Sequence, residues 1–407
     1  MPVFTSSIEV TADYPTIKPS LNLNFLKARA LDSRVTLERA SAATYIGRDG
    51  LVKYAGEDEP RFDHDPDTLE SLGLLLEESR TNIAIYGDDM SQYTSVNMTK
   101  TANDAVAPDG TTTATKLEHG GGGNTWYLDY SPGNTNASGA GSYTYSVWVK
   151  APDDQPDDYY GCRIAILTST GNNTETVFSL KKTWSRITIT KTYASETGTI
   201  RIHPIIFRTS PGNSDGGKVT PSYVWVWGSQ WEQGTFATSY IPTHGSTVTR
   251  AVDTAVIKGT NFSSWYNASE STIFFESGVA PVNNSKYFTF QGTDGGGTEL
   301  IEAAAVSGPG ANIFTYADST VHSNISVTDA SATALKYAVG VKANDINLAI
   351  NGTLGTTDTS STQPDAIDKL IIGNYSTGNY YANTTIKKLS YYPKRLPNAQ
   401  LQGLTQQ

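Results

Sequence analysis

The strongest constraint on the fold is a repeated pattern of short segments in which apolar and polar residues alternate. Clear examples are residues 143–151 (YTYSVWVKA), 184–193 (WSRITITKTY) and 346–355 (INLAINGTLG). A period of two residues is typical of β-strands with one buried face. Clusters of Gly, Asn, Asp and Pro separate these runs, and no long amphipathic helix pattern is present. The sequence therefore predicts an all-β protein.

Residues 222–228 (SYVWVWG) carry large apolar side chains at successive positions. Val224 and Val226 fall on one face of the expected strand, and Trp225 and Trp227 fall on the other. We therefore expect both faces of this strand to be covered by other parts of the protein.

The strand-like segments form three blocks. Residues 1–80 hold short, scattered apolar runs that cannot close a core alone, so we predict an arm that packs on the later domains or on a partner. Residues 81–250 and 251–407 each contain enough strands for a sandwich, and Asn351-Gly352 favours a tight hairpin turn in the last block. The expected fold is two successive antiparallel jelly-roll β-sandwiches preceded by an irregular N-terminal arm with short strands.

Charge and cysteine content restrict the classes of partner. The formal net charge of −10 argues against nucleic acid and against an anionic membrane surface, whereas a neutral polar partner such as a glycan fits. Cys162 is the single cysteine, which excludes intrachain disulfides and argues against a cysteine-based metal site. The N-terminus lacks the pattern of a Sec-type signal peptide, and no apolar run is long enough to insert into a membrane. We expect folding in a reducing cytoplasm.

The catalytic motifs are weak, and we expect no enzymatic activity. Residues 212–216 fit G-x-S-x-G around Ser214, but a Pro-Gly turn precedes them and a strand pattern follows, which favours a loop over an esterase elbow. Glycoside hydrolysis needs two facing carboxylates, and no strand carries a matching pattern of acids. Glycoside hydrolase and esterase remain as alternatives.

Aromatic and amide side chains in loops are the candidate glycan-binding groups. Aromatic faces stack on sugar rings, tyrosine adds a hydroxyl group, and asparagine supplies amide hydrogen bonds. Half-buried tyrosine also suits sheet packing and subunit contacts, so this alternative stays open for each residue. The candidates are Trp126, Tyr127, Tyr130, Asn374, Tyr375, Asn379, Tyr380 and Tyr381.

Metal binding is a further hypothesis. Asp63, Asp65 and Asp67 are spaced like the first ligands of a calcium loop, but the later Gly and Glu of an EF-hand are missing, so an ordinary turn is the alternative. Asp294 lies in a glycine-rich stretch that could form a loop site for a cation. We expect that no cofactor is required and leave calcium open.

Two regions resemble known families. Residues 346–355 (INLAINGTLG) and 368–404 (DKLIIGNYSTGNYYANTTIKKLSYYPKRLPNAQLQGL) resemble the end of a laminin-G-like, concanavalin A-like lectin domain, with a hairpin, an "I-G" strand, a closing strand and a short helix. The resemblance covers only this C-terminal stretch, and it implies a lectin-type jelly roll for residues 251–407.

Residues 1–250 resemble a module of tailed-bacteriophage structural proteins. The resemblance implies a virion protein of the tail fibre, tailspike or minor tail class, in which residues 81–250 form a carbohydrate-binding-module-like jelly roll. The matching stretches are 19–25 (PSLNLNF), 31–91 (LDSRVTLERA…YGDDMS), 107–118 (APDGTTTATKLE), 143–151 and 227–253 (WGSQWEQGTF…TRAVD).

The resulting hypothesis is a phage virion structural protein, assembled in the bacterial host cytoplasm and exposed on the particle surface. Residues 1–80 would contact other virion proteins, and the two sandwiches would bind host cell-surface glycan non-covalently, as in a tail fibre or adhesin. We expect a homo-oligomer and leave a trimer open. The alternatives are a capsid- or tail-decorating protein that binds neighbouring virion proteins and no sugar, and a glycan-degrading tailspike.

Overall fold

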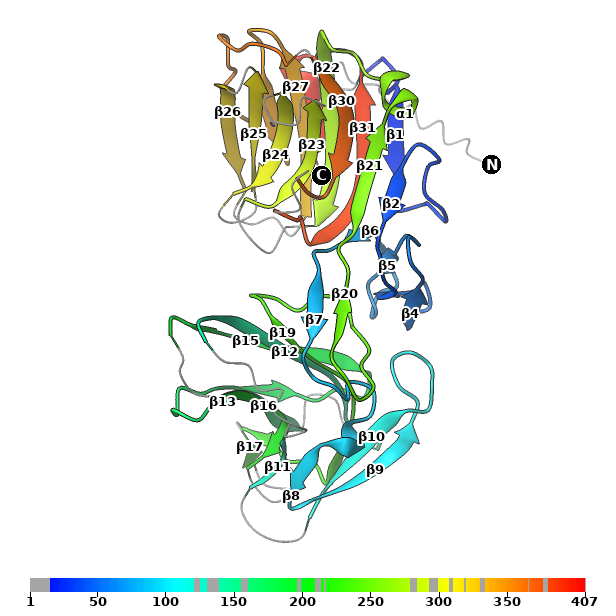
Figure 1. Ribbon diagram of the computed structural model, residues 1–407, viewed down its shortest axis with the longest axis vertical. Helices are drawn as coiled ribbons and strands as arrows, with labels where there is room; N and C mark the ends of the chain where they lie inside the picture. The colour runs from blue at the N-terminus through cyan, green and yellow to red at the C-terminus, as the bar shows by residue number, and fades with distance from the viewer. Residues whose placement is uncertain are drawn as a thin grey trace, which may run out of the picture.

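The computed structural model describes most of the chain between residues 15 and 406. The described ranges are 15–120, 125–129, 139–154, 160–195, 199–208, 214–215, 217–278, 284–292, 299–306, 310–317, 320–329, 334–364, 366–375 and 380–406. Nearly all regular structure in these ranges is β, arranged as two sandwiches one above the other (Figure 1), which confirms the predicted fold class. Among the described residues, neither helix has the length or apolar character needed to cross a bilayer.

The upper sandwich contains most of the C-terminal block. Within the described ranges, one of its sheets has eight strands in the order β29-β28-β27-β22-β31-β6-β5, with β1 also paired to β31. The Asn351-Gly352 turn between β28 and β29 has φ values of 45° and 82°, so the predicted hairpin is confirmed. The strands are β1 (Leu21–Asn24), β5 (Phe62–His64), β6 (Ser71–Leu76), β22 (Glu270–Gly278), β27 (Ala334–Lys342), β28 (Asn347–Ile350), β29 (Thr353–Leu354) and β31 (Thr384–Tyr392).

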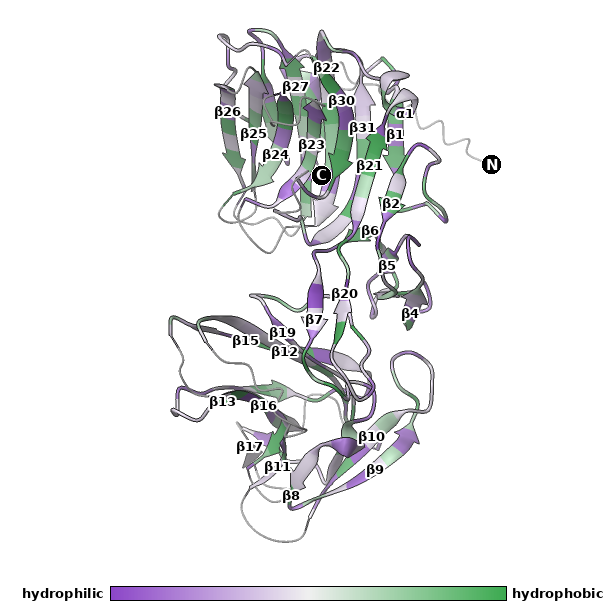
Figure 2. Ribbon diagram, viewed as in Figure 1, coloured by the Kyte–Doolittle hydropathy of each residue, from purple (hydrophilic) through white to green (hydrophobic). Residues whose placement is uncertain are grey.

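The second sheet of the upper sandwich runs in the order β2-β21-β30-β23-β24-β25-β26. Hydrophobic residues follow the strands of both sheets (Figure 2) and meet in one shared core. The short helix α1 (Thr260–Ser263) packs into this core through Phe262, whereas α2 (Asn398–Thr405) packs on the outer face of the eight-stranded sheet, in a separate cluster with Phe274 and Ala338. The strands of the second sheet are β2 (Thr36–Glu38), β21 (Thr254–Lys258), β23 (Lys286–Gly292), β24 (Leu300–Ala305), β25 (Gly310–Ala317), β26 (Thr320–Thr328) and β30 (Ile367–Ile372).

The described part of residues 1–80 belongs largely to the upper sandwich, so of the two predicted alternatives the structure shows packing on a later domain. Strands β1 and β6 pair with β31, and β2 pairs with β21. Leu21 and Leu23 of β1 are buried in the common core. Strands this short leave their hydrogen-bonding groups unpaired unless they join an existing edge, and β31 and β21 provide those edges.

A small collar, defined here as residues 39–67, lies between the two sandwiches. Its hairpin consists of β3 (Ala43–Ile46) and β4 (Val52–Ala55), with a turn at Arg48-Asp49-Gly50 between them. Thr44 donates a hydrogen bond through Oγ1 to the carbonyl of Tyr240, at 2.5 Å, in the lower sandwich. The collar therefore contacts both sandwiches.

The lower sandwich is formed by residues 83–247 and is inserted between two halves of the upper one. Its sheets have the orders β15-β12-β19-β10-β9 and β14-β13-β16-β11-β8. Val224 and Val226 face its core, and Trp227 packs with the collar on the other face, as predicted. The elements are η1 (Met90–Gln92), β8 (Thr94–Val96), β9 (Met98–Ala105), β10 (Ala114–His119), β11 (Trp126–Asp129), β12 (Gly141–Lys150), β13 (Gly161–Thr168), β14 (Thr174–Ser179), β15 (Ser185–Tyr193), β16 (Ile200–Phe207) and β19 (Tyr223–Gln233).

Two antiparallel strands carry the chain into and out of the inserted sandwich. They are β7 (Arg80–Asn82) and β20 (Val248–Arg250), and they form a two-stranded ribbon visible between the sandwiches in Figure 1. β7 is strongly hydrophilic (Figure 2), yet its Arg80 and Asn82 side chains are buried. Asn82 donates hydrogen bonds to the carbonyls of Ser229 and Ile241 at 3.1 and 2.9 Å, which ties β7 to the lower sandwich. The predicted pair of successive sandwiches is therefore corrected to one sandwich inserted into the other.

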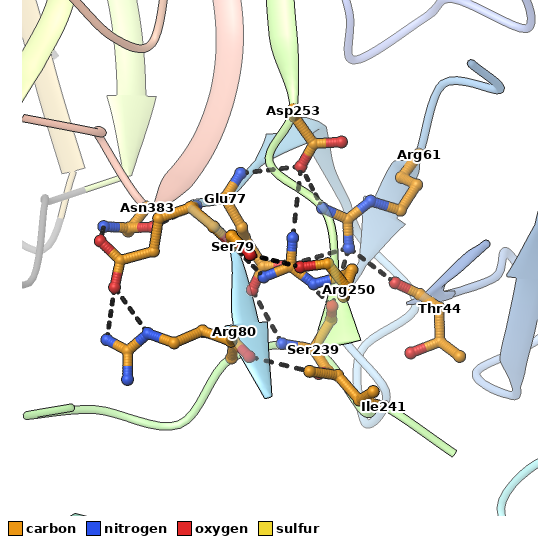
Figure 3. Close-up of polar contacts among 12 residues, drawn as sticks. Thr44, Arg61, Glu77, Ser79, Arg80, Ser239, Ile241, Arg250, Asp253 and Asn383 are labelled. Atoms are coloured by element: carbon orange, nitrogen blue, oxygen red, sulfur yellow. Dashed lines mark hydrogen bonds and ion pairs between the residues drawn. The ribbon is translucent and has the colours of Figure 1, made fainter. Parts of the chain in front are cut away.

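A buried charge network fastens this junction (Figure 3). Arg61 of the collar contacts Glu77 at 2.8 Å and Asp253 at 2.5 Å. Arg39 contacts Asp253 at 3.0 Å, and Arg250 lies 3.5 Å from Glu77. All five side chains are buried, so the ions are removed from water, and the two carboxylates offset two of the three arginine charges.

Hydrogen bonds extend the network into the inserted sandwich. The Ser239 hydroxyl and backbone N–H donate to the two carboxylate oxygens of Glu77, at 2.6 and 2.8 Å. Burial alone would raise the pKa of Glu77, but Arg250, Arg61 and the Ser239 donors outweigh it and lower the pKa to about 2. Glu77 is therefore ionised in the folded protein at neutral pH.

Candidate functional site: an aromatic pocket on the upper sandwich

An open pocket of about 330 Å³ lies on the outer face of the seven-stranded sheet. Strand alternation creates its floor: Ile301 of β24 and Ile313 of β25 face the core, which leaves the intervening residues on the opposite face. Leu300 pairs with Tyr316, and Glu302 pairs with Phe314, across these two strands. The floor therefore combines two aromatic rings, an aliphatic side chain and a carboxylate.

The segment between β30 and β31 forms the wall of the pocket. Tyr375 and Tyr380, both predicted as glycan-binding candidates, line it. The backbone N–H of Lys286 donates to the Tyr380 carbonyl at 2.7 Å, which holds this segment against β23. Tyr380 has a φ of 63° and is 50% exposed, so its ring stands at the rim of the pocket.

A buried ion pair forms the polar centre of the pocket. Lys286 Nζ lies 2.8 Å from Glu302 Oε1 and donates a second hydrogen bond to Asn284 Oδ1 at 3.0 Å. The same ammonium group lies 5.6 Å from the ring centroid of Phe314 and 5.5 Å from that of Tyr380. Lysine has three N–H donors, so these two acceptors leave one donor for a ligand. A buried ion pair is a poor way to gain stability, and its position in an open pocket points to recognition.

Tyr316 and Tyr375 keep their protons at neutral pH. Burial raises the pKa of Tyr316 and of Tyr375, and the Glu302 carboxylate raises both further. Both phenols can therefore donate and accept hydrogen bonds. The effect of Glu302 on both tyrosines is consistent with its carboxylate lying on the pocket side of the sheet.

The chemistry of these groups suits binding of a small polar molecule with apolar faces. Aromatic rings stack on such faces, while hydroxyls and the Lys286–Glu302 pair fix the orientation through hydrogen bonds. Glu302 is the single carboxylate among the described residues that line the pocket. A glycosidase of the usual kind needs two carboxyl groups across the scissile bond, so this lining favours binding over hydrolysis.

The other candidates from the sequence occupy different places. Tyr381 is half-buried and forms a β-bridge with Lys286 at the edge of the pocket. Asn374 is 3% exposed, and its carbonyl accepts a hydrogen bond from Thr289 Oγ1 at 3.1 Å behind the pocket wall. Asn379 lies outside the described residues.

The candidates in the inserted sandwich do not join this pocket. Trp126 is 1% exposed and sits in the core, 3.6 Å from the ring centroid of His119, so its ring offers no surface for stacking. Tyr127 is half-buried and stacks on His203 at 4.4 Å. Burial and two nearby arginines lower the pKa of His203 to about 4, so this stacked ring is neutral. Tyr130 lies outside the described residues.

The predicted calcium triad does not converge. Asp63 is half-buried and accepts a hydrogen bond from the Ile46 backbone N–H at 2.7 Å, whereas Asp65 accepts from the N–H groups of Asp67 and Thr68. Among the described residues, no group of three Asp, Glu, His or Cys side chains is arranged to hold a metal ion. The ordinary turn is therefore the correct interpretation of this stretch, and Asp294 lies outside the described residues.

The G-x-S-x-G stretch also lacks the required geometry. Ser214 lies in β17 (Ser214–Asp215), which pairs with β18 (Lys218–Val219) in a short ribbon. A nucleophile elbow requires a helix directly after the serine, and here a second strand takes that place.

The pocket centre was missed in the sequence, although a signal was present. Glu302 is the one charged residue in the apolar run 300–305 (LIEAAA), and Phe314 and Tyr316 alternate with core positions in 310–317. Aromatic residues on the outer face of a strand, opposite an isolated acid, indicate a surface that binds a ligand or a partner.

Comparisons with known proteins give only distant structural similarity. No protein-family profile and no curated protein sequence matches the chain. A sialidase CBM40 module of Ruminococcus gnavus bound to α2,3-sialyllactose gives a TM-score of 0.31 at 14% identity, over 36% of this chain and 88% of the module.

Two further structures are similar over longer stretches. The CBM22 tandem of Paenibacillus barcinonensis Xyn10C gives a TM-score of 0.27 at 7% identity, over 77% of this chain and 98% of the other. Domains LG4–5 of the mouse laminin α1 chain give 0.25 at 8% identity, over 64% and 85%. At these scores the comparisons assign neither a family nor a ligand to the chain.

Proposed function

We propose that the protein is a non-catalytic adhesin that binds a neutral glycan in the aromatic pocket of the upper sandwich. The observation that carries this proposal is the pocket centre, where Lys286 and Glu302 form a neutral pair among Phe314, Tyr316, Tyr375 and Tyr380. A donor and an acceptor side by side match two adjacent hydroxyl groups of a sugar. The aromatic rings provide the apolar surface on which the sugar ring packs.

The charge of the pair selects a neutral sugar. Glu302 balances the Lys286 ammonium group at 2.8 Å, so an incoming carboxylate would gain little attraction from Lys286. The same carboxylate would approach the Glu302 carboxylate in a partly buried site, where like charges repel strongly. A neutral hexose or N-acetylhexosamine meets neither obstacle.

A glycan array with the full chain tests this proposal. Wild type should bind neutral glycans, and Tyr380→Ala should weaken binding about tenfold, since stacking and hydroxyl contacts are lost together. Tyr54→Ala is the matched control, because Tyr54 is 54% exposed and lies away from the pocket. Glu302→Gln should shift the preference toward acidic sugars by leaving the Lys286 charge unbalanced. Absence of binding to any neutral glycan, or equal loss in the two tyrosine variants, would contradict the proposal.

We also propose that this adhesin belongs to the virion of a tailed phage, as a tail fibre component. The resemblance carried by residues 1–250 supports this assignment. Many copies on one particle would turn weak single-site binding into firm attachment. Location and copy number in purified particles test it. If the chain occurs in stoichiometric virion subassemblies while binding no glycan, the decorating structural protein is the better description.

A further inference from the structure

A second, larger cavity lies between the collar and the inserted sandwich. It is a groove of about 850 Å³ whose volume falls within the range of ligand sites. One wall belongs to the collar and includes Asp49 and Asp67. The opposite wall belongs to the inserted sandwich and includes Lys150, Lys181 and Arg186. Ligand sites occur preferentially at domain interfaces of this kind.

Hydrogen bonds hold both walls in place. The backbone N–H of Val52 in the collar donates to the Pro108 carbonyl at 2.9 Å, which closes one end of the groove. The Lys181 carbonyl accepts from the Ala151 N–H at 2.7 Å, which anchors the lysine-bearing turn to the end of β12. Trp184 donates through Nε1 to the Val106 carbonyl at 3.0 Å. Contacts within the chain therefore hold both walls of the groove.

The wall on the inserted sandwich is basic, in contrast to a protein with a net charge of −10. Lys150, Lys181, Lys182 and Arg186 all line it. The Arg186 guanidinium lies 4.4 Å from the Trp148 ring centroid and donates to the Thr238 carbonyl and the Ser146 hydroxyl. Burial lowers the pKa of Arg186, and the carboxylates of Glu232, Glu77 and Asp63 oppose this shift. The exposed cation of this wall is therefore Lys181.

The collar wall restricts the class of anion. Asp49 is paired with Lys53 at 2.7 Å, and Asp67 is exposed. Closely spaced phosphates would be repelled by these carboxylates, and nucleic acid binding depends on many such contacts. A sugar chain with carboxylates on some atoms and hydroxyls on others matches both walls, since hydroxyls can donate to Asp67. The half-buried Trp184 ring lines the groove between these walls and supplies an apolar surface for a sugar ring.

We propose that this groove is a second binding site and that it takes an acidic saccharide chain, such as a uronate oligomer. The carboxylates lie against the basic wall at Lys181, and a sugar ring packs on Trp184. The site shares no residue with the aromatic pocket of the upper sandwich. This proposal is therefore independent of the proposed neutral-glycan function.

Titration of the full chain with a galacturonate hexamer, followed by tryptophan fluorescence, tests the proposal. Wild type should bind, and the dissociation constant should rise when the salt concentration increases from about 20 to about 200 mM, because salt screens charges at exposed sites. Lys181→Glu should weaken binding by at least about tenfold, since an attraction is replaced by a repulsion. Lys258→Glu is the matched control, an equally exposed lysine on the upper sandwich, and should change the constant less than about twofold.

Several outcomes would overturn the proposal. Equal weakening by Lys181→Glu and Lys258→Glu would mean that only the overall charge of the protein matters. Equal affinity for a maltose-type hexamer would remove the role of the carboxylates, and tighter binding of a short single-stranded DNA would replace the saccharide with a nucleic acid. Tyr380→Ala should leave uronate binding unchanged. If that variant abolishes binding, the uronate occupies the aromatic pocket and the groove is not a site.

Discussion

Glu77→Gln is the sharpest perturbation of the joint between the two sandwiches. The substitution keeps the shape of the side chain but removes one of two carboxylates that balance Arg39, Arg61 and Arg250. The Glu77 pKa of about 2 in the folded state, against an ordinary value of 4.5, corresponds to about 3 kcal/mol of stability at neutral pH. Measured losses on breaking a buried ion pair are about 3–5 kcal/mol. We expect Glu77→Gln to lower the free energy of unfolding by a similar amount.

The pH dependence gives this prediction a second, independent readout. Because the folded-state pKa is depressed, the contribution of Glu77 is complete above pH 4.5 and is lost as the pH falls toward 2. At pH 3.5 the difference between wild type and variant should shrink to about 2 kcal/mol. A merely steric effect of the substitution would be independent of pH.

Urea unfolding at pH 7.5 and at pH 3.5, followed by tryptophan fluorescence, measures both quantities. The control is Glu118→Gln, which removes an exposed carboxylate paired with Lys116 at 3.2 Å and should cost less than about 1 kcal/mol. A Glu77→Gln variant within about 1 kcal/mol of wild type at pH 7.5 would refute the reasoning. A difference of unchanged size at pH 3.5 would refute the assignment of the effect to ionisation.

Three further substitutions probe the collar and the N-terminal strands by urea unfolding. Burial raises the pKa of Asp63 to about 6, so its ionisation removes stability as the pH rises from 3.8 to 6. Asp63→Asn keeps the acceptor for the Ile46 N–H and should raise the free energy of unfolding by about 1–3 kcal/mol at pH 8 and by less than about 1 kcal/mol at pH 4. An equal gain at the two pH values would contradict this explanation. Leu23→Ala should lower the free energy of unfolding by about 2–5 kcal/mol, because Leu23 is 2% exposed in the core of the upper sandwich. Almost no change would show that the N-terminal strands do not contribute to this core. Gly73→Ala should lower the free energy of unfolding by about 1–3 kcal/mol, because φ is 102° and a Cβ would lie 2.2 Å from the Ile386 carbonyl oxygen. Unchanged stability would show that β6 does not pack tightly against β31.

The individual strands could be predicted from the sequence because their determinants are local. Alternation placed Val224 and Val226 in the core and Trp227 on the opposite face, and Asn351-Gly352 defined its own turn. The insertion could not be predicted in the same way. β1 pairs with β31, which lies near the other end of the sequence, and nothing in so short a segment identifies so distant a partner.

The structure brings two of the predicted site residues to a pocket and buries another. Tyr375 and Tyr380 line the aromatic pocket. Trp126 was predicted to lie in a loop, yet it alternates with Leu128 in β11 and both are buried. Lys286 and Glu302 come from different strands, so their pairing depends on the register between β23 and β24 rather than on any local motif.

The joint connects the two proposed sites mechanically. Arg61 and Arg39 come from the collar, Glu77 follows β6, and Arg250 and Asp253 flank the return to the upper sandwich. A buried network that draws on all these segments resists bending, since rotation of either sandwich would separate charges in a poorly solvated space. The aromatic pocket and the groove are then held at a fixed spacing. A surface that presents neutral and acidic sugars at that spacing would be bound at both sites at once. Binding at the first site would then raise the effective concentration of the ligand at the second site, and a rigid joint gives a larger gain in affinity than a flexible linker would.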